Sequence, residues 1–223
     1  MKEDITIIDN YHKLMLGDHR QILNICKDES LEDIDKQVRI ISILAGKSED
    51  EILHLPIPEY KALVAKSRFL QEPMPDTSRI ASKYNIGKFE LVPVKDYRKI
   101  TTAQYIDFQS FHQAGMEDHI VEILSCLLVP DGTYVDAEGR TRRYSYNEGY
   151  DIIEVQNAIR DNLSVADGLS LYAFFLISSQ DLIKDMLTYS RKEAKRLKDK
   201  TKREEILKQI EQQEELLRIN GVG

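Results

Sequence analysis

The stretch SVADGLSLYAFFLI, residues 164–177, decides the fold class. Ser164 and Asp167 stand at the spacing of a helix-start box, in which a side chain caps the first free backbone amides. Residues 169–177 are apolar almost all round, which is typical of a buried helix, and we expect this segment to be the most buried element of the chain. The sequence therefore predicts a mainly α fold, a helical bundle.

Further helix starts lie on the N-terminal side of this segment. Asp18 and Ser30 are candidate N-caps for helices that run to about Lys27 and to Ala45-Gly46. The second of these helices carries an apolar stripe, formed by Leu31, Ile34, Val38, Ile41, Ile43 and Leu44. Ser48 and Glu51 form a capping box for a short helix. Pro58 occupies the first position of a helix that reaches about Gln71.

The middle of the chain adds helices and short hairpins. Thr101 with Gln104 starts a helix that ends near Gln113, another spans about 117–128, and Asp151 starts a third. Residues 5–16 predict a small hairpin around Asp9-Asn10. Residues 79–92 predict a second one, packed or at a sheet edge, because Pro93 cannot donate within a central strand. Residues 134–146 predict a polar hairpin that projects between helices, with residues 137–139 at its tip.

We predict a division into residues 1–72, an N-terminal helical domain, and 73–96, a linker and hairpin. Residues 97–190 form a second helical domain that includes the projecting hairpin 130–150, and 191–223 form a long charged C-terminal helix. Both helical regions contain a Tyr-x-Lys-aliphatic string, at 11–14 and 97–100, followed by a capped helix. This repetition suggests an internal duplication of 1–72 in 88–190.

Charge is distributed unevenly along the 223 residues, whose formal net charge is −7. Residues 190–223 hold ten basic and seven acidic side chains, which leaves 21 basic and 31 acidic for the rest. An acidic body argues against nucleic acid as the partner. Cys26 and Cys126 form no disulfide framework, and we expect both to be buried. The absence of a membrane-length apolar run and of a signal peptide predicts a cytoplasmic protein with no membrane contact.

A search for chemical motifs favours binding over catalysis. The sequence has no phosphate-binding glycine loop and no nucleophile elbow. His112 and His119 are seven residues apart, with Glu122 nearby, but metal sites need three or four converging ligands. The acidic turn that begins at Asp131 has Val135 where a calcium loop needs an oxygen ligand. We predict no catalytic, cofactor-binding or metal-binding residues, and the chain is not expected to be an enzyme.

Two regions are candidates for binding a protein partner. The C-terminal segment combines a basic block with a thin apolar stripe, represented by Arg196, Ile206, Ile210 and Leu217. The projecting hairpin concentrates residue types that dominate binding hot spots, namely Tyr134, Arg142, Arg143, Tyr144 and Tyr146. A solvated helix and ordinary cross-strand pairing are the alternatives. The sequence also leaves a homo-oligomer open.

Two stretches resemble a known group of proteins. Residues 41–64, ISILAGKSEDEILHLPIPEYKALV, combine an aliphatic helix, a Leu-x-Gly turn, an acidic helix start and a Leu-Pro turn before another helix. In this they resemble bacteriophage tail assembly chaperones, and residues 99–109, KITTAQYIDFQ, are similar in character. Residues 134–146 and the charged C-terminal segment have no counterpart in that pattern.

The resemblance implies a non-enzymatic helper of a tailed phage in the host cytoplasm. Such proteins bind the long helical tape measure protein and recruit tail-tube subunits during assembly. One alternative is a structural virion component, such as a head-tail connector or tail-complex protein, that makes permanent protein contacts. Another is an uncharacterised enzyme or RNA-binding regulator.

Overall fold

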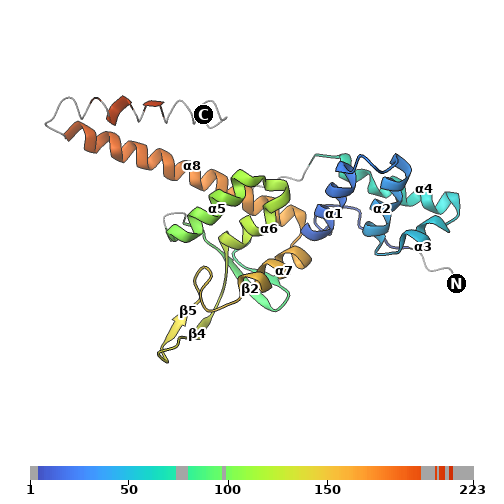
Figure 1. The fold of residues 1–223 in the computed structure, drawn as a ribbon, viewed down its shortest axis with the longest axis horizontal. Coiled ribbons are helices and arrows are strands. Elements are labelled where there is room, and N and C mark those ends of the chain that lie inside the picture. Colours follow the sequence, from blue (N-terminus) through green and yellow to red (C-terminus); the bar gives the residue numbers. More distant parts are fainter. Residues whose placement is uncertain are drawn as a thin grey trace.

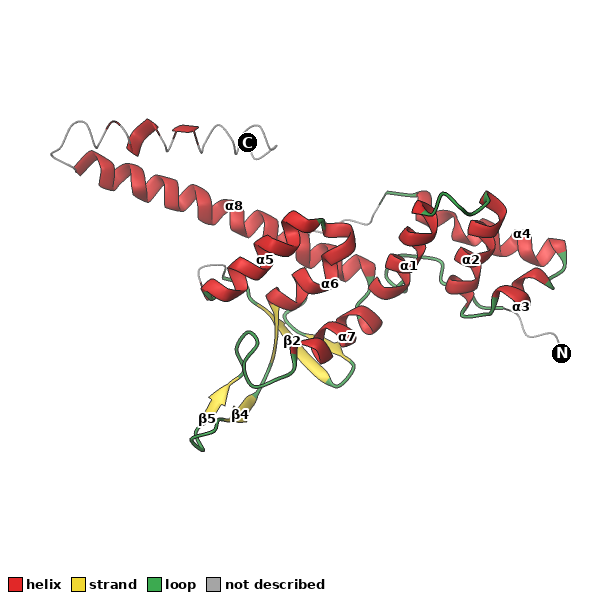
Figure 2. Ribbon diagram, viewed as in Figure 1, coloured by secondary structure: helices red, strands yellow, loops and turns green. Residues whose placement is uncertain are grey.

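The computed structural model describes residues 5–73, 80–96, 99–196, 204, 206–208 and 211–212. These residues are mainly helical, with a few small antiparallel strands, which confirms the prediction of a mainly α fold (Figure 2). The helices are α1 (Leu16–Lys27), α2 (Asp33–Ala45), α3 (Glu49–Leu53), α4 (Ile57–Lys66), the 3-10 helix η1 (Ser67–Gln71), α5 (Thr102–Ala114), α6 (Met116–Leu127), α7 (Ile152–Asn162) and α8 (Val165–Arg196). Figure 1 shows α1–α4 at one end and α8 extending toward the other.

Four helices begin where the sequence places their caps. The Ser48 hydroxyl accepts from the Glu51 amide at 3.2 Å, and the Glu51 carboxylate accepts from the Ser48 amide at 2.9 Å. Thr101 and Gln104 form the same reciprocal box at the start of α5. Asp151 caps α7, and Ser164 accepts from the Asp167 amide at 3.1 Å. Each box satisfies backbone donors that a helix start leaves free.

Two predicted caps are wrong. Helix α1 begins at Leu16, two residues before Asp18, because the Leu16 amide donates to the Leu163 carbonyl at 3.0 Å. A main-chain partner there removes the need for a side-chain cap. The Ser30 hydroxyl donates to Asp28 at 2.6 Å, so α2 begins later, with Glu32 at its N-cap.

The hairpin predicted for residues 5–16 is also wrong. The turn exists, because the Asn10 side chain accepts from the His12 and Lys13 amides, but its flanks do not pair with each other. Instead the Ile8 amide donates to Leu44, and Leu14 accepts from the Val165 amide at 2.8 Å. The segment thus connects α2 to the start of α8.

A three-stranded antiparallel sheet has the order β1-β2-β3. Its strands are β1 (Tyr84–Ile86), β2 (Phe89–Pro93) and β3 (Leu128–Pro130). The hairpin β1-β2 was predicted, but β2 is the central strand and not an edge, because β3 pairs with it. Pro93 is tolerated as the last residue of β2, and the next amide, Val94, donates to Leu127 at 3.0 Å.

Helix α6, and not residues 169–177, is the most buried helix of the described chain. Its residues Ile123, Leu124, Cys126 and Leu127 are fully buried, and each such aliphatic side chain contributes about 1.5–3 kcal/mol. Residues 169–177 are less buried than expected, because Ile177 is 60% exposed. A Cβ on Gly168 would lie 3.0 Å from a Leu16 methyl and 3.3 Å from one of Leu124, so α8 crosses α1 and α6 closely.

Of the two cysteines predicted to be buried, only one is. Cys126 is buried, but Cys26 is exposed, because it lies on the outward side of α1.

Helix α1 packs on α2 and also on α6, α7 and α8, so residues 1–72 contact the second helical region directly. The linker residues 74–76 and most of 197–223 lie outside the described residues. The duplication stays a prediction. Within the described part of the chain no helix is long and apolar enough to cross a membrane.

Candidate protein-interaction surfaces

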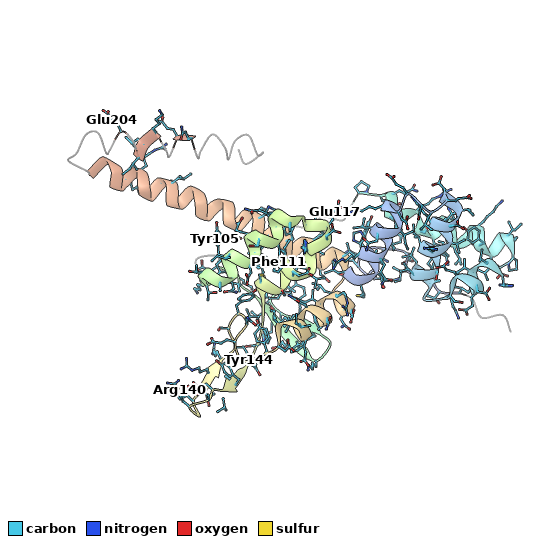
Figure 3. The ribbon with its side chains drawn as sticks, in the orientation of Figure 1. Tyr105, Phe111, Glu117, Arg140, Tyr144 and Glu204 are labelled. Atoms are coloured by element: carbon cyan, nitrogen blue, oxygen red, sulfur yellow. The ribbon has the colours of Figure 1, made fainter. Side chains whose placement is uncertain are left out.

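The projecting hairpin consists of β4 (Thr133–Val135) and β5 (Thr141–Arg143), and its existence confirms the predicted hairpin at 134–146. Tyr134 pairs with Arg142 across the two strands. Because side chains alternate along a strand, one face of the ribbon holds Tyr134, Asp136, Arg140, Arg142 and Tyr144. Figure 3 shows Arg140 at the tip and Tyr144 closer to the body.

Tyrosine rings stiffen the base of this hairpin. Tyr134 and Tyr144 stack at 5.8 Å between ring centroids, and Tyr150 meets Tyr144 edge-on at 5.9 Å. Gly149, at φ +86°, passes against Tyr134, where a Cβ would lie 2.3 Å from a ring carbon. A larger residue at 149 would push the Tyr134 ring out of its stack.

Asp136 organises the tip. Its side chain is 10% exposed and accepts hydrogen bonds from the backbone amides of Glu138 and Arg140. It also accepts from the guanidinium groups of Arg140 and Arg142, at 2.9 and 2.5 Å. Desolvation raises the pKa of Asp136, but these hydrogen bonds outweigh it and lower the pKa. Arg142 is therefore paired within the hairpin, although it shares the Asp136 carboxylate with Arg140.

Arg143 lies on the opposite face, which it shares with Thr133, Val135 and Thr141. All four side chains are exposed. The Arg143 backbone pairs with Thr133 across the ribbon. A hydrogen bond from Lys83, and to a lesser extent the Arg143 charge, lowers the pKa of Asp131. Of the two hairpin arginines predicted to bind a partner, Arg142 is paired with Asp136 and Arg143 is exposed.

Tyr146 lies at the junction of hairpin and body, not on the outer surface. Its hydroxyl donates to the Asp107 carboxylate at 2.8 Å and lies 3.5 Å from the Cys126 sulfur. Burial, followed by these two neighbours, raises the pKa of Tyr146. Burial also raises the pKa of the Cys126 thiol to about 11. Tyr146 thus anchors the hairpin to α5 and α6.

The four predicted C-terminal residues are less fully placed. Arg196 is the last residue of α8, and Ile206 is helical and half-buried. Ile210 and Leu217 lie outside the described residues. The described end of α8 lies away from the projecting hairpin (Figure 1).

An apolar groove on the N-terminal helices was not predicted. It encloses about 180 Å³ between α2, α3 and α4. Its floor includes the buried side chains of Val38 and Ile52. Its rim exposes three large aliphatic side chains, Ile34, Leu53 and Ile57, at 54%, 66% and 69%. A cluster of exposed apolar side chains marks an interaction surface more often than a single exposed apolar side chain does.

A local signal for this groove was present in the sequence. Ile34 is flanked by Asp33 and Asp35, and Ile57 stands between Pro56 and Pro58. Helical spacing assigned Ile34 to the core stripe, but only Val38, Ile41 and Leu44 of that stripe are buried. The Tyr60 hydroxyl donates to Gln37 at 2.8 Å and fixes α4 against α2 beside the groove.

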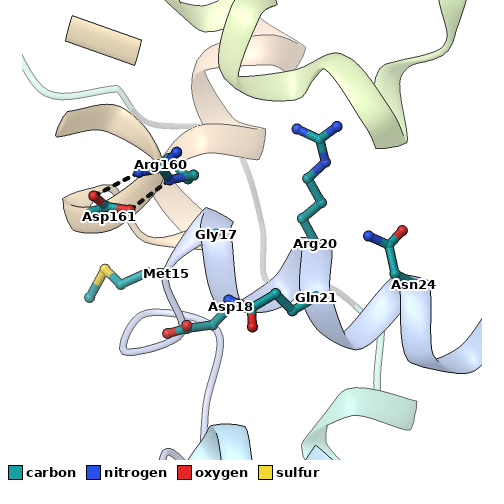
Figure 4. Close-up of a pocket in the computed structure, with 8 residues that line it drawn as sticks. All are labelled: Met15, Gly17, Asp18, Arg20, Gln21, Asn24, Arg160 and Asp161. Atoms are coloured by element: carbon teal, nitrogen blue, oxygen red, sulfur yellow. Dashed lines mark hydrogen bonds and ion pairs between the residues drawn. The ribbon is translucent and has the colours of Figure 1, made fainter. Parts of the chain in front are cut away.

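A polar pocket of about 320 Å³ lies where α1 meets the end of α7 (Figure 4). Arg160 pairs with Asp161 through two contacts, at 2.7 and 3.1 Å. Burial, and then the Asp161 charge, raise the pKa of Asp18. The eight residues that line this pocket include no histidine, cysteine, serine or lysine.

The histidines are separate. His112 bonds the Tyr172 hydroxyl at 2.8 Å, whereas His119 packs against Phe111. Among the described residues, no three histidine, cysteine or acidic side chains converge as metal ligands would.

Comparison with known proteins gives no relative: no family model matches the chain, and neither a curated protein nor a solved structure is similar to it.

Proposed function

We propose that this protein is a non-enzymatic assembly helper of a tailed bacteriophage. It acts in the host cytoplasm, where it binds the tape measure protein and tail-tube subunits during tail assembly. The observation that carries the proposal is the solvent-exposed apolar groove between α2, α3 and α4. A groove lined by aliphatic side chains fits the apolar face of an amphipathic helix, and a tape measure protein is a long helical client.

The location of the groove supports the resemblance to tail assembly chaperones. Residues 41–64 carry that resemblance, and they supply Ile52, Leu53, Leu55, Ile57 and Tyr60 of its lining. An unassembled helical client exposes an apolar stripe that promotes aggregation until a partner covers it. The negative charge of the body keeps such a complex in solution.

A structural virion component is the second candidate. The hairpin β4-β5 supports it, because stacked tyrosines and the bonded Asp136 hold a projecting element in one shape before any partner arrives. Preorganised surfaces suit permanent contacts, since little entropy is lost on binding.

The architecture proposed with this function is a helical bundle with an internal duplication of 1–72 in 88–190. We also propose that the charged segment 191–223 is a helix that docks onto partners. A homo-oligomer is compatible with it.

The test is a tagged pull-down, after nuclease treatment, from cells that express the source genome, read by mass spectrometry. We expect a very long helical protein or tail-tube subunits with the unchanged chain, and their loss with Leu53→Ser/Ile57→Ser. The matched control is Ile153→Ser on α7, where the side chain is also exposed, at 56%. Recovery of stable particle proteins alone would favour the structural candidate, and recovery of no protein partner would contradict both.

A further inference from the structure

The apolar groove is too small for a typical small-molecule ligand. It encloses about 180 Å³, whereas such ligands occupy sites of about 300–1,000 Å³. Its volume suits a few aliphatic side chains inserted from outside. Helices α2, α3 and α4 each contribute to the rim. The partner's surface therefore has to be long enough to reach all three helices. One face of a helix, with anchors three or four residues apart, meets that requirement.

The surroundings of the groove are acidic. Residues 28–61, which include every lining residue, hold nine acidic and four basic side chains, a formal charge of −5. Asp33 and Asp35 flank Ile34 on α2, and Glu49 precedes Leu53 by one helical turn on α3. All three carboxylates are exposed. Arg39 lies 3.6 Å from Glu49, so this carboxylate is already partly paired and the net charge of the segment stays at −5.

The apolar stripe of this chain's own C-terminal segment does not match the groove. Residues 204–218, which contain Ile206, Ile210 and Leu217, hold five acidic and two basic side chains. If they occupied the groove, their net charge of −3 would lie against the formal charge of −5 on residues 28–61. Like charges brought together at a binding surface lower affinity, so residues 204–218 of a second copy are disfavoured as the occupant.

We infer that the groove binds a basic amphipathic helix of another protein. Aliphatic anchors at helical spacing enter between Ile34, Leu53 and Ile57, and lysine or arginine side chains beside them face Asp33, Asp35 and Glu49. This inference rests on the proposed function and defines the chemistry of its client segment. The charges select the partner and speed the encounter, whereas the anchors supply most of the affinity.

The experiment uses two synthetic peptides of about 18 residues, five helical turns, with identical leucine anchors. One carries lysine and the other glutamate at the remaining charged positions, and a third keeps the lysines but replaces the leucines with serine. Binding to the full chain is measured by fluorescence anisotropy. We expect the lysine peptide to bind at least about tenfold more tightly than either of the others. Raising salt from about 0.05 to 0.5 M should weaken it.

Two variants locate the binding. Leu53→Ser/Ile57→Ser removes the anchor contacts, and we expect it to weaken the lysine peptide by about tenfold or more. Asp33→Lys/Glu49→Lys reverses rim charge, and we expect it to shift the preference toward the glutamate peptide. All substituted side chains are exposed, so unchanged circular dichroism confirms that the variants fold.

Equal binding of the lysine and glutamate peptides would overturn the inference. Binding of the lysine peptide that survives Leu53→Ser/Ile57→Ser would also overturn it, because the contact would lie elsewhere on the acidic body. In either case a client that is lost from the pull-down with the same variant would leave the proposed function standing. Peptide binding as expected, with no client recovered from cells, would contradict the proposed function alone.

Discussion

At the scale of single residues, Tyr146 is the side chain whose polar contacts matter most for the hairpin. Tyr146→Phe removes the hydroxyl that bonds Asp107 at 2.8 Å and leaves the carboxylate without that donor. We expect a loss of about 1–3 kcal/mol in the free energy of unfolding, measured by urea denaturation. Tyr144→Phe is the control, because Tyr144 contributes its ring to the stack. Equal losses in the two variants would contradict this account.

His19 predicts how stability depends on pH. Burial lowers its pKa below the ordinary 6.5, and the Glu117 charge opposes the shift only in part. Below about pH 6.5 the unfolded chain therefore binds more protons than the folded chain does, and the free energy of unfolding falls as pH falls.

His19→Gln should flatten this dependence between about pH 7.5 and 5.5, measured by urea denaturation at each pH. Lys27, which bonds Glu117 at 2.9 Å, keeps its charge throughout that range. The control is His12→Gln, since His12 is exposed. A slope that persists unchanged without His19 would show that other groups cause it.

At the scale of elements, the helix caps offer a paired test. Ser48→Ala removes the side chain that accepts from the Glu51 amide, and we expect a loss of about 1 kcal/mol. Ser30 looks like a cap in the sequence but donates to Asp28 instead, so Ser30→Ala should stay within about 0.5 kcal/mol. Chemical denaturation of both variants measures the two changes in the free energy of unfolding. A larger loss from Ser30→Ala than from Ser48→Ala would mean that the assigned start of α2 or α3 is wrong.

The same contrast explains which elements could be predicted from sequence. Ser48, Thr101 and Asp151 cap their helices through partners two or three residues away, so the local sequence contains the whole interaction. Strand β3 was missed because Leu128-Val129 continues the apolar pattern of α6, and its partner strand β2 is distant in sequence. Residues 5–16 look like a hairpin locally, but their amides donate to the carbonyls of Leu44 and Leu163, and their carbonyls accept from the amides of Val165 and Ala166.

At the scale of the whole molecule, Leu16 joins the N-terminal helices to the rest. It is 2% exposed and lies against Gly168 of α8. We expect Leu16→Ala to cost about 2–5 kcal/mol and Leu53→Ala, at an exposed position, to cost far less. Circular dichroism reports the unfolding of all helices. Tyrosine fluorescence reports mainly the second region, because nine of the eleven tyrosines lie in residues 84–189.

If the two regions unfold together, Leu16→Ala lowers the urea midpoint equally by circular dichroism and by tyrosine fluorescence. A shift seen by circular dichroism alone would show that α1–α4 unfold separately. The sequence could not predict this joint, because the Tyr-x-Lys string at 11–14 suggested a repeat and not a contact with residues 163–166. The groove escaped prediction for a related reason, since helical spacing cannot tell a covered aliphatic face from an uncovered one.

The most direct test of the central claim is site-specific photo-crosslinking in cells that express the source genome. A photoreactive residue replaces Leu53 in the groove or, as the control, Ile153 on α7. We predict that position 53 crosslinks one long helical protein, through a segment with aliphatic anchors and basic neighbours, and that position 153 does not. No crosslink at 53, or the same products from both positions, would contradict the claim that this groove holds the partner.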